Sequence, residues 1–571
     1  MKQLTGLDAT FLYMETPNTF GHVTGLMLFD RPTPDFDPFA AVHDMYASLV
    51  GRIEPMRRRL VEVPLGLDHP YWIFDPNFDL DFHIRALNIP KPGLVDQLAD
   101  QVARIVGRAM DRSRPLWEVY VIEGLADGSW GLLTKYHHAT IDGAAGQLML
   151  EMILSADPHV PPPEPSPDWE PEAIPTPAEL LRLTAANLAR NPIKAARTQL
   201  RLVRTAAQAL GVSDVSGVAA TASDLLRRAA GRGADHRPRV SLPVTPAPPT
   251  PWNRTITPHR RFALRTTSLD NIKRLKQVTG GTVNDIVMAI CAGGLRSYLL
   301  AHDALPDKPL RAMVPVSIRT GNESDPWTNR VSGIIADLPT NVDDPIERIA
   351  RCHEAMVVAK RQMELVPAEA LIDITQFSPP VLSTAAVRLA SQLKLADRVN
   401  MPVNLVISNV PGPREPLYFQ GAQMLHQFPV SIVTDGQGLN ITVQSYMDRL
   451  GFGFIADRDL VPDVWDLADF HIAEIDRLFE ASGAERAAAP EQPEPRRGAM
   501  RDVIAARQAD GRARHQRSAP TTEQRTAPSP RADGVKRPAA AKKLPATKPA
   551  ATKQTATKRA PTAAKKPAAG A

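Results

Sequence analysis

Proline is spread unevenly along this chain of 571 residues, and it limits where helices and strands can form. Two stretches, residues 155–177 (SADPHVPPPEPSPDWEPEAIPTP) and 237–251, are especially rich in proline. Neither a helix nor a central strand can run through them, because proline lacks the backbone N–H and blocks the preceding helical turn. The sequence therefore predicts two folded segments, 1–155 and 252–482, joined by a linker over residues 156–251.

The C-terminal residues have a different composition. Residues 536–571 are almost entirely Ala, Lys, Arg, Thr and Pro, with ten basic residues and no acidic one. Such a sequence cannot bury enough apolar surface to offset its ordering entropy, so we expect a disordered tail over 483–571. Its ten charges exceed the net charge of +5, so residues 1–535 are net acidic and are not expected to bind nucleic acid. The tail is either a non-specific tether to anionic lipid or nucleic acid, or a solubilising extension.

Both folded segments alternate strand-like and helical runs, which is typical of an α/β fold. In the first segment the strand-like runs are Val119–Ile122 and Gly131–Lys135, and the helical runs are Ala40–Val50 and Gln97–Met110. In the second segment a long helix is predicted at Val283–Leu300, with strand-like runs at Ala312–Ile318, Val403–Ser408 and Leu439–Ser445.

The linker contains a helical, basic and amphipathic stretch over residues 178–231, broken near Pro192. This pattern has two interpretations. It is either an attachment to an anionic membrane or lipid surface, or a helical bridge that packs on the folded body with a solvated basic face.

Two features indicate a cytoplasmic location. The only cysteines are Cys291 and Cys352, which favours a cytosolic protein with two buried thiols. No run of 18 apolar residues is present, and the first residues lack the apolar region of a signal peptide. We therefore expect any membrane association to be peripheral.

The densest chemical signal is Tyr136–Gly143 (YHHATIDG). It follows a strand-like run and precedes the helical run Ala144–Ile153, so His137 and His138 are expected at the exit of a strand, on a rigid platform. A histidine there can act as a general base near neutral pH. Asp142 can fix the turn or an arginine, and Gly143 allows close packing or a positive φ.

Other interpretations of the two histidines remain. A metal site would need three or four ligands, and no HExxH motif or cysteine pair supports one. A purely structural histidine pair is also compatible with the spacing. A Ser-His-Asp triad lacks its G-x-S-x-G nucleophile elbow, whereas a base that activates the substrate's own hydroxyl needs no protein nucleophile.

HHATIDG matches the HHxxxDG motif of the coenzyme A-dependent acyltransferase superfamily. Further segments, in matching order over roughly residues 1–480, make the chain resemble the bacterial wax ester synthase/diacylglycerol acyltransferase family. They are Leu4–Phe11 (LTGLDATF), Gly21–Val23, Ser113–Glu118 (SRPLWE), Thr282–Asp285 (TVND), Asn329–Ser332 (NRVS) and Ser408–Pro413 (SNVPGP).

The resemblance implies an α/β fold of two chloramphenicol-acetyltransferase-like domains with a tunnel between them. Acyl-CoA would enter as co-substrate from one side and an alcohol from the other. In this scheme His138 removes the proton of the acceptor hydroxyl, Asp142 orients or supports, and His137 supports the site. No metal and no bound cofactor are expected.

The remaining motifs each have two interpretations. Asn284 either donates to the oxyanion of the reaction or caps the helix that follows it, and Asp285 is expected to be structural in the first helical turn. Pro115, Leu116 and Trp117 either line a substrate channel or pack in the core. The SNVPGP segment reads as a strand end followed by a turn near the domain interface.

The resemblance therefore implies an acyl-CoA-dependent O-acyltransferase that makes triacylglycerol from diacylglycerol, or wax ester from a long-chain alcohol, at a membrane or lipid-droplet surface. The alternatives are a condensation enzyme with another acceptor and a non-catalytic lipid-surface protein. The intact histidine motif argues against the last of these.

Overall fold

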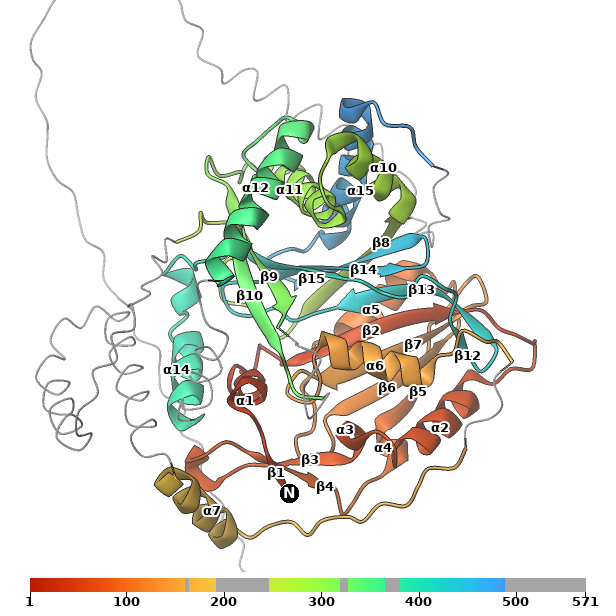
Figure 1. The fold of residues 1–571 in the computed structure, drawn as a ribbon, viewed down its shortest axis with the longest axis vertical. Coiled ribbons are helices and arrows are strands. Elements are labelled where there is room, and N and C mark those ends of the chain that lie inside the picture. Colours follow the sequence, from red (N-terminus) through yellow and green to blue (C-terminus); the bar gives the residue numbers. More distant parts are fainter. Residues whose placement is uncertain (160–163, 191–245, 319–326, 365–379, 488–571) are drawn as a thin grey trace, which may run out of the picture. The chain divides into compact units, whose positions relative to one another are not determined.

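Two six-stranded mixed sheets form the framework of the protein in a computed structural model (Figure 1). The structure describes residues 1–159, 164–190, 246–318, 327–364 and 380–487, all within one unit, Met1–His515. The two sheets with their helices confirm the predicted α/β class. Apart from residues 483–487, the predicted tail lies outside the described residues.

The first sheet has the strand order β12-β13-β2-β7-β6-β5, and only its β5–β6 pair is parallel. Its strands are β2 (His22–Phe29), β5 (Ile84–Asn88), β6 (Trp117–Glu123), β7 (Trp130–His137), β12 (Tyr418–Phe419) and β13 (Ala422–Val430). The predicted strand-like runs of the first segment lie within β6 and β7. A separate three-stranded sheet is formed by β1 (Lys2–Gln3), β4 (Tyr71–Phe74) and β3 (Arg58–Val61), in that order.

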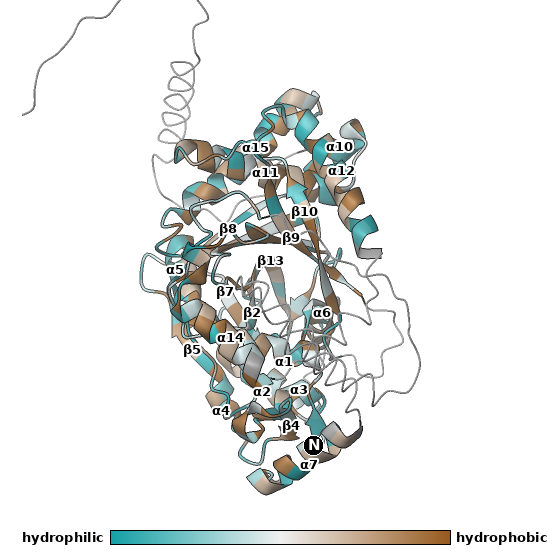
Figure 2. Ribbon diagram, turned by 90° about the vertical axis from the view of Figure 1, so that its left-hand side faces the viewer, coloured by the Kyte–Doolittle hydropathy of each residue, from teal (hydrophilic) through white to brown (hydrophobic). Residues whose placement is uncertain are grey.

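The second sheet has the order β10-β9-β11-β14-β15-β8, with β11 parallel to both of its neighbours. Its strands are β8 (Arg260–Ser268), β9 (Leu310–Ser317), β10 (Val331–Leu338), β11 (Leu405–Val410), β14 (Leu439–Tyr446) and β15 (Arg449–Asp457). Figure 2 shows hydrophobic residues along the strands of this sheet. Strands β8, β14 and β15 are buried on both faces, whereas the edge strand β10 alternates exposed and buried residues.

Helices pack around the two sheets, and α5 lies where the sheets meet, with its buried residues in one cluster with residues of β2 and β8. In the first half they are α1 (Gly6–Tyr13), α2 (Pro38–Leu49), α3 (Glu54–Arg57), α4 (Leu80–His83), α5 (Val95–Val106), α6 (Gly143–Ile153) and α7 (Pro177–Arg190). In the second they are α10 (Leu269–Thr279), α11 (Val283–Ala301), α12 (Pro345–Glu364), α14 (Pro380–Gln392) and α15 (Val464–Ser482). The 3₁₀ turns are η1 (Pro64–Gly66) and η2 (Leu395–Asp397).

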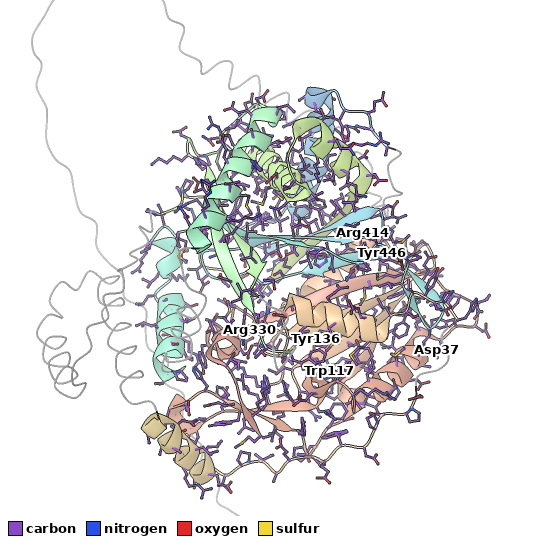
Figure 3. All side chains as sticks on the ribbon, viewed as in Figure 1. Asp37, Trp117, Tyr136, Arg330, Arg414 and Tyr446 are labelled. Atoms are coloured by element: carbon purple, nitrogen blue, oxygen red, sulfur yellow. The ribbon has the colours of Figure 1, made fainter. Side chains whose placement is uncertain are left out.

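The second half of the sequence contributes a strand pair to the first sheet. β12 and β13 come from the second half of the sequence but extend the first sheet, where β13 pairs with β2. Tyr446 of β14 fastens this crossing segment, since its hydroxyl donates to Met424 O at 2.9 Å and accepts from Leu417 N–H at 3.0 Å (Figure 3). The segment boundaries predicted at residues 155 and 252 do not show that strands of the second half join the first sheet.

The sheets pack against each other through glycines on β15. A Cβ atom built on Gly451 would lie 2.2 Å from Gln427 O, and one on Gly453 would lie 1.8 Å from Pro429 O. Both contacts are to the β13 backbone, so only glycine permits this approach of the two sheets. A cluster of buried side chains from α5, β8 and β13 fills the space beside them.

Helix α11 is the central helix of the second half. It confirms the long helix predicted at Val283–Leu300 and is one residue longer. Among the described residues it alone is long and apolar enough to cross a membrane, but 78% of its apolar window is buried inside the protein. Cys291 in this helix and Cys352 in α12 are both free and buried, as predicted.

The described part of the linker packs on the first half. Leu180 of α7 is 3% exposed and contacts the cluster that includes Val61 and Tyr71. Asn187 donates to Tyr71 Oη and Asp68 Oδ2. Over residues 177–190 the helical bridge is therefore the interpretation that the structure supports. The rest of the predicted basic helical stretch lies outside the described residues.

Candidate active site

The histidine motif occupies the turn between β7 and α6, which confirms the predicted strand–turn–helix placement. His137 is the last residue of β7 and pairs with His22 of β2. The turn closes through two hydrogen bonds: His138 N–H donates to Gly21 O at 2.8 Å, and Thr140 N–H donates to His137 O at 2.8 Å. The backbone on both sides of His138 is therefore held by regular structure.

His137 has both ring nitrogens engaged. Its Nδ1 accepts from Ala139 N–H at 3.0 Å, so Nε2 carries the proton and donates to Glu15 Oε1 at 3.2 Å. The side chain is only 1% exposed. His137 therefore has no free nitrogen for a substrate proton, in agreement with the supporting role that the motif implies.

Glu15 is the anchor of His137 and is itself held from three sides. Its carboxylate accepts from His137, from Gly21 N–H at 2.7 Å and from Arg112 Nη2 at 2.7 Å. Burial opposes ionisation, but these three donors outweigh it and lower the pKa of Glu15 to about 2. Glu15 is thus a fixed anion in contact with His137.

His138 has a different environment. Its ring stacks on Phe11 of α1, with centroids 4.3 Å apart and an interplanar angle of 9°. Its Nδ1 is buried and has no hydrogen-bond partner among the described residues. Burial, followed by the neighbouring His137, lowers the pKa of His138 to about 4. The imidazole is therefore neutral at pH 7, which is the form that can accept a proton.

Asp142 fixes the start of α6 and joins the two halves. One carboxylate oxygen accepts from Ala145 N–H at 2.9 Å and caps the helix. The other accepts from Arg330 N–H at 2.9 Å, in the segment that leads into β10. Arg330 is labelled in Figure 3 close to α6 and Tyr136. Asp142 is 1% exposed, so it orients the turn and does not face a substrate.

Asn329 makes a second bridge between the halves. Its side-chain amide donates to His138 O at 2.6 Å and to Asp8 Oδ1 at 2.7 Å. Its backbone N–H also donates to Asp8 Oδ1, at 3.0 Å. Asp8 belongs to α1 and is 4% exposed, and its other oxygen accepts from Thr5 Oγ1 at 2.6 Å. We call Asp8 and Asn329 the clamp of the histidine turn.

Comparison with known proteins agrees with this geometry. Residues 4–287 match the wax ester synthase/diacylglycerol acyltransferase (WS/DGAT) catalytic domain, and residues 327–478 match the WS/DGAT C-terminal domain. The chain belongs to this family. It is accordingly an acyltransferase, and its two domain matches contain the histidine turn and the Asn329 bridge respectively.

Individual WS/DGAT relatives cover most of the chain. O-acyltransferase WSD of Acinetobacter baylyi is 34% identical over 482 residues, which are 84% of this chain and 97% of that protein. "Probable diacyglycerol O-acyltransferase tgs2" of Mycobacterium tuberculosis is 35% identical over 482 residues, 83% of this chain and 98% of that protein. The structure of the WS/DGAT from Marinobacter aquaeolei VT8 has a TM-score of 0.60 at 30% identity, covering 85% of this chain and 100% of that one.

Two expectations about the family motifs are wrong in detail. A Cβ atom built on Gly143 would have no other atom within 4 Å, and its φ is not positive, so neither close packing nor a left-handed backbone explains this glycine. It leaves open space at the first residue of α6. Asn284 is not the helix cap: Thr282 caps α11, because its hydroxyl accepts from Asp285 N–H at 3.2 Å.

Asp285 is structural, as predicted, because it completes this capping box by accepting from Thr282 N–H at 2.8 Å. The Asn284 side-chain oxygen accepts from Asn409 Nδ2 at 3.3 Å, which brings the TVND and SNVPGP segments together. Among the described residues no hydrogen bond joins Asn284 to the histidine turn. Its predicted oxyanion role stays a prediction.

Pro115, Leu116 and Trp117 pack in the core, the second of their two interpretations. Leu116 is 0% exposed and its carbonyl accepts from His137 N–H at 3.0 Å. Trp117 is 1% exposed, donates from Nε1 to Met56 O at 2.9 Å and stacks on His83. These residues therefore support the histidine strand from behind.

A small cavity of about 10 Å³, which is room for one water molecule, lies beside the turn. Its lining includes Ala139 and Thr140 of the turn, Asp8 of the clamp, and Trp72 and Trp327. Thr140 is 3% exposed and its hydroxyl has no partner among the described residues, so it can donate to a ligand there. In the part of the chain that the structure describes, no three His, Cys, Asp or Glu side chains gather as a metal site.

Proposed function

We propose that this acyltransferase moves a fatty acyl group from acyl-CoA to the hydroxyl of diacylglycerol or of a long-chain alcohol, giving triacylglycerol or wax ester. The observation that carries the proposal is the contrast between the two histidines. His137 has both nitrogens engaged, whereas His138 is neutral, its Nδ1 has no hydrogen-bond partner among the described residues, and its backbone is held from both halves. The names of the relatives supply the substrate classes.

The reaction needs one proton carrier. A ring nitrogen of His138 removes the proton from the acceptor hydroxyl as that oxygen attacks the thioester carbonyl. The tetrahedral intermediate then collapses, the carbon–sulfur bond breaks, and the proton passes from the imidazolium to the leaving CoA sulfur. The ester carries the acyl group, and His138 returns to its neutral form. General-base assistance of this kind contributes about 10²–10⁴-fold in rate.

The clamp and Asp142 would position this base. Asn329 holds the carbonyl of His138, and Asp142 holds the helix start four residues later. Phe11 fixes the ring plane. Because a small misplacement of a reacting group lowers the rate strongly, residues that share no contact with substrate would still matter for turnover.

The pKa of His138 gives the proposal a pH signature. Its pKa is lowered to about 4, so the neutral base is fully present at pH 7 and is lost only as the pH falls through about 4. Acyl transfer should therefore stay level between pH 7 and pH 5 and fall about tenfold per unit below pH 4. The measurement is kcat/KM against pH. An acidic limb near pH 6.5 would contradict it.

An acceptor panel tests the substrate class. Purified protein would be given palmitoyl-CoA with diacylglycerol, hexadecanol, a long-chain amine or no acceptor, and free CoA thiol would be measured. Release that depends on diacylglycerol or hexadecanol is the expected result, and the faster of the two names the preferred product. Release that depends only on the amine would replace the proposal with a condensation enzyme.

We also propose that the protein works on the cytoplasmic side of a membrane or at a lipid droplet, attached peripherally. The support is chemical, because diacylglycerol and long-chain alcohols reside in lipid and a bound enzyme must reach them there.

A further inference from the structure

Exposed apolar side chains gather on three elements of the described structure. Of the thirteen large hydrophobic residues that are exposed there, seven lie on η1 and the residue after it, on α7, or on α14 and the turn that follows it. The seven are Leu65, Leu67, Leu181, Val381, Leu389, Leu393 and Val399. Both α7 and α14 contact η1, so the three elements are neighbours, and we call their seven exposed residues the apolar face. Helices α14 and α7 lie one below the other in Figure 1.

Leu65 is the most unusual member of this face. It is 82% exposed, and its φ of +58° is a left-handed conformation that costs energy for any residue with a Cβ. Exposing a leucine to water is also unfavourable. Contact of the Leu65 side chain with a binding partner would offset both costs. The turn between β3 and β4 presents this side chain at the surface, where such a contact can form.

Helix α14 extends the same face. Val381 and Leu389 are eight residues apart and Leu393 follows four later, so all three lie along one side of the helix axis. They are 45%, 53% and 45% exposed. The helix begins against η1, since a Cβ on Gly66 would lie 3.5 Å from the Val381 Cα atom.

The exposed charges on α7, α14 and the turn that follows it are mainly positive, whereas two acidic residues, Glu62 and Asp68, flank η1. The exposed basic residues on α7, α14 and the following turn are Arg182, Arg388, Lys394 and Arg398. The exposed acidic residues on the same elements are Glu179 and Asp397, and Asp397 accepts a hydrogen bond from Thr255 N–H at 2.8 Å. Since residues 1–535 are net acidic, this positive excess is local.

The apolar face is also close to the catalytic base in the fold. Helix α14 contacts α1, and α1 carries both Phe11, which stacks on His138, and Asp8 of the clamp. A ligand bound along α14 would therefore sit one helix away from the histidine turn.

We propose that the apolar face binds an anionic lipid surface and brings a lipid-borne acceptor to the side of the molecule that holds His138. Leucines that enter the acyl region, with Arg and Lys on the same helices to meet anionic headgroups, are the pattern of an interfacial anchor. A protruding, strained leucine suits a fluid medium with no shaped pocket. The proposal rests on the proposed function, because it assigns that reaction's acceptor to a membrane.

The test is flotation of the full chain with vesicles, using variants matched in size and charge. Leu65→Ser/Leu389→Ser/Leu393→Ser removes the apolar contacts, and Arg388→Glu/Lys394→Glu reverses two of the positive charges. The controls change the same number of exposed residues elsewhere: Val278→Ser/Ile335→Ser/Val358→Ser, and Arg274→Glu/Lys276→Glu on α10. Vesicles are phosphatidylcholine alone or phosphatidylcholine with phosphatidylglycerol, and melting temperature is recorded for every protein.

The unaltered chain and both controls should float with the anionic vesicles, and the serine variant should partition at least about tenfold more weakly. The charge variant should lose the preference for anionic vesicles. Equal flotation of all the proteins would overturn the proposal. So would a change from dimer to monomer in the serine variant without loss of flotation, since a second copy would then cover this face.

Transfer to a water-soluble short-chain alcohol separates this proposal from the proposed function. The ratio of the rates with vesicle-borne diacylglycerol and with soluble alcohol should fall in the serine variant only. If the unaltered chain transfers to neither acceptor, the proposed function fails whatever the vesicles show.

Discussion

The two six-stranded sheets of this protein differ in how self-contained they are. The second sheet takes all of its strands from the second half of the sequence, whereas the first sheet, which carries the histidines, takes β12 and β13 from that half. The capping acids of α6 and α11 show the same difference. Asp142 reaches across to Arg330, while Asp285 contacts Thr282 and His353 within its own half. The catalytic region is thus built by both halves, and the other region by one.

The contact between the sheets gives the largest expected effect on stability. In Gly453→Ala the new Cβ would meet Pro429 O at 1.8 Å, so the strand or the whole sheet must move. We expect the free energy of unfolding to fall by about 1–3 kcal/mol. Urea or thermal unfolding measures it. Gly143→Ala is the control, because a Cβ there meets nothing within 4 Å. Equal stability of the two variants would mean that the sheets are not locked together.

The clamp gives the next largest effect, and it acts on activity. Asn329→Asp removes the donor to His138 O and places a second carboxylate beside Asp8. We expect kcat to fall by about 10–100-fold, which corresponds to one or two lost hydrogen bonds to a buried acceptor.

The double variant Asp8→Asn/Asn329→Asp sharpens this test. It restores a donor–acceptor pair between the two side chains but not the bond to the His138 carbonyl. Melting temperature should recover while kcat stays low. Recovery of both would reduce the clamp to a purely structural contact.

Asp285, which has the same capping role in the second half as Asp142 has in the first, should give the smallest effect on stability when it is replaced. Asp285→Ala removes the capping box of α11 and its contact with His353, and we expect about 1 kcal/mol of lost stability. The activity of the folded fraction should stay close to that of the unaltered protein. A loss of kcat as large as in Asn329→Asp would show that the second half also shapes the site through Asp285.

Local sequence patterns predict many of the helices and strands of this fold. The helix at α11, the strands β6 and β7, and the turn between β7 and α6 follow from hydrophobic periodicity within windows of a few residues. The hydrogen bonds of His137 and Asp285 fit the supporting roles predicted for them, and these roles stay predictions. These features could be predicted because neighbours in sequence determine them.

Long-range contacts could not be predicted in the same way. Asp8 and Asn329 lie in segments that resemble family motifs, yet nothing in the spacing of residues 321 positions apart shows that they touch. Glu15 lies outside every motif that we singled out, and only the structure places it below His137. The pairing of β13 with β2 of the first sheet could not be predicted for the same reason, since the sequence of a strand does not determine which strand it pairs with.

The assignment of His138 as the catalytic base is tested most directly by CoA release from palmitoyl-CoA with diacylglycerol or hexadecanol. The unaltered protein is compared with His138→Ala and His137→Gln. If His138 is the base, acceptor-dependent release should fall by at least about 10²-fold in His138→Ala while the melting temperature is kept. His137→Gln should fall less, because that residue positions the turn and carries no substrate proton. Full activity of His138→Ala in a folded protein would contradict the assignment of the base.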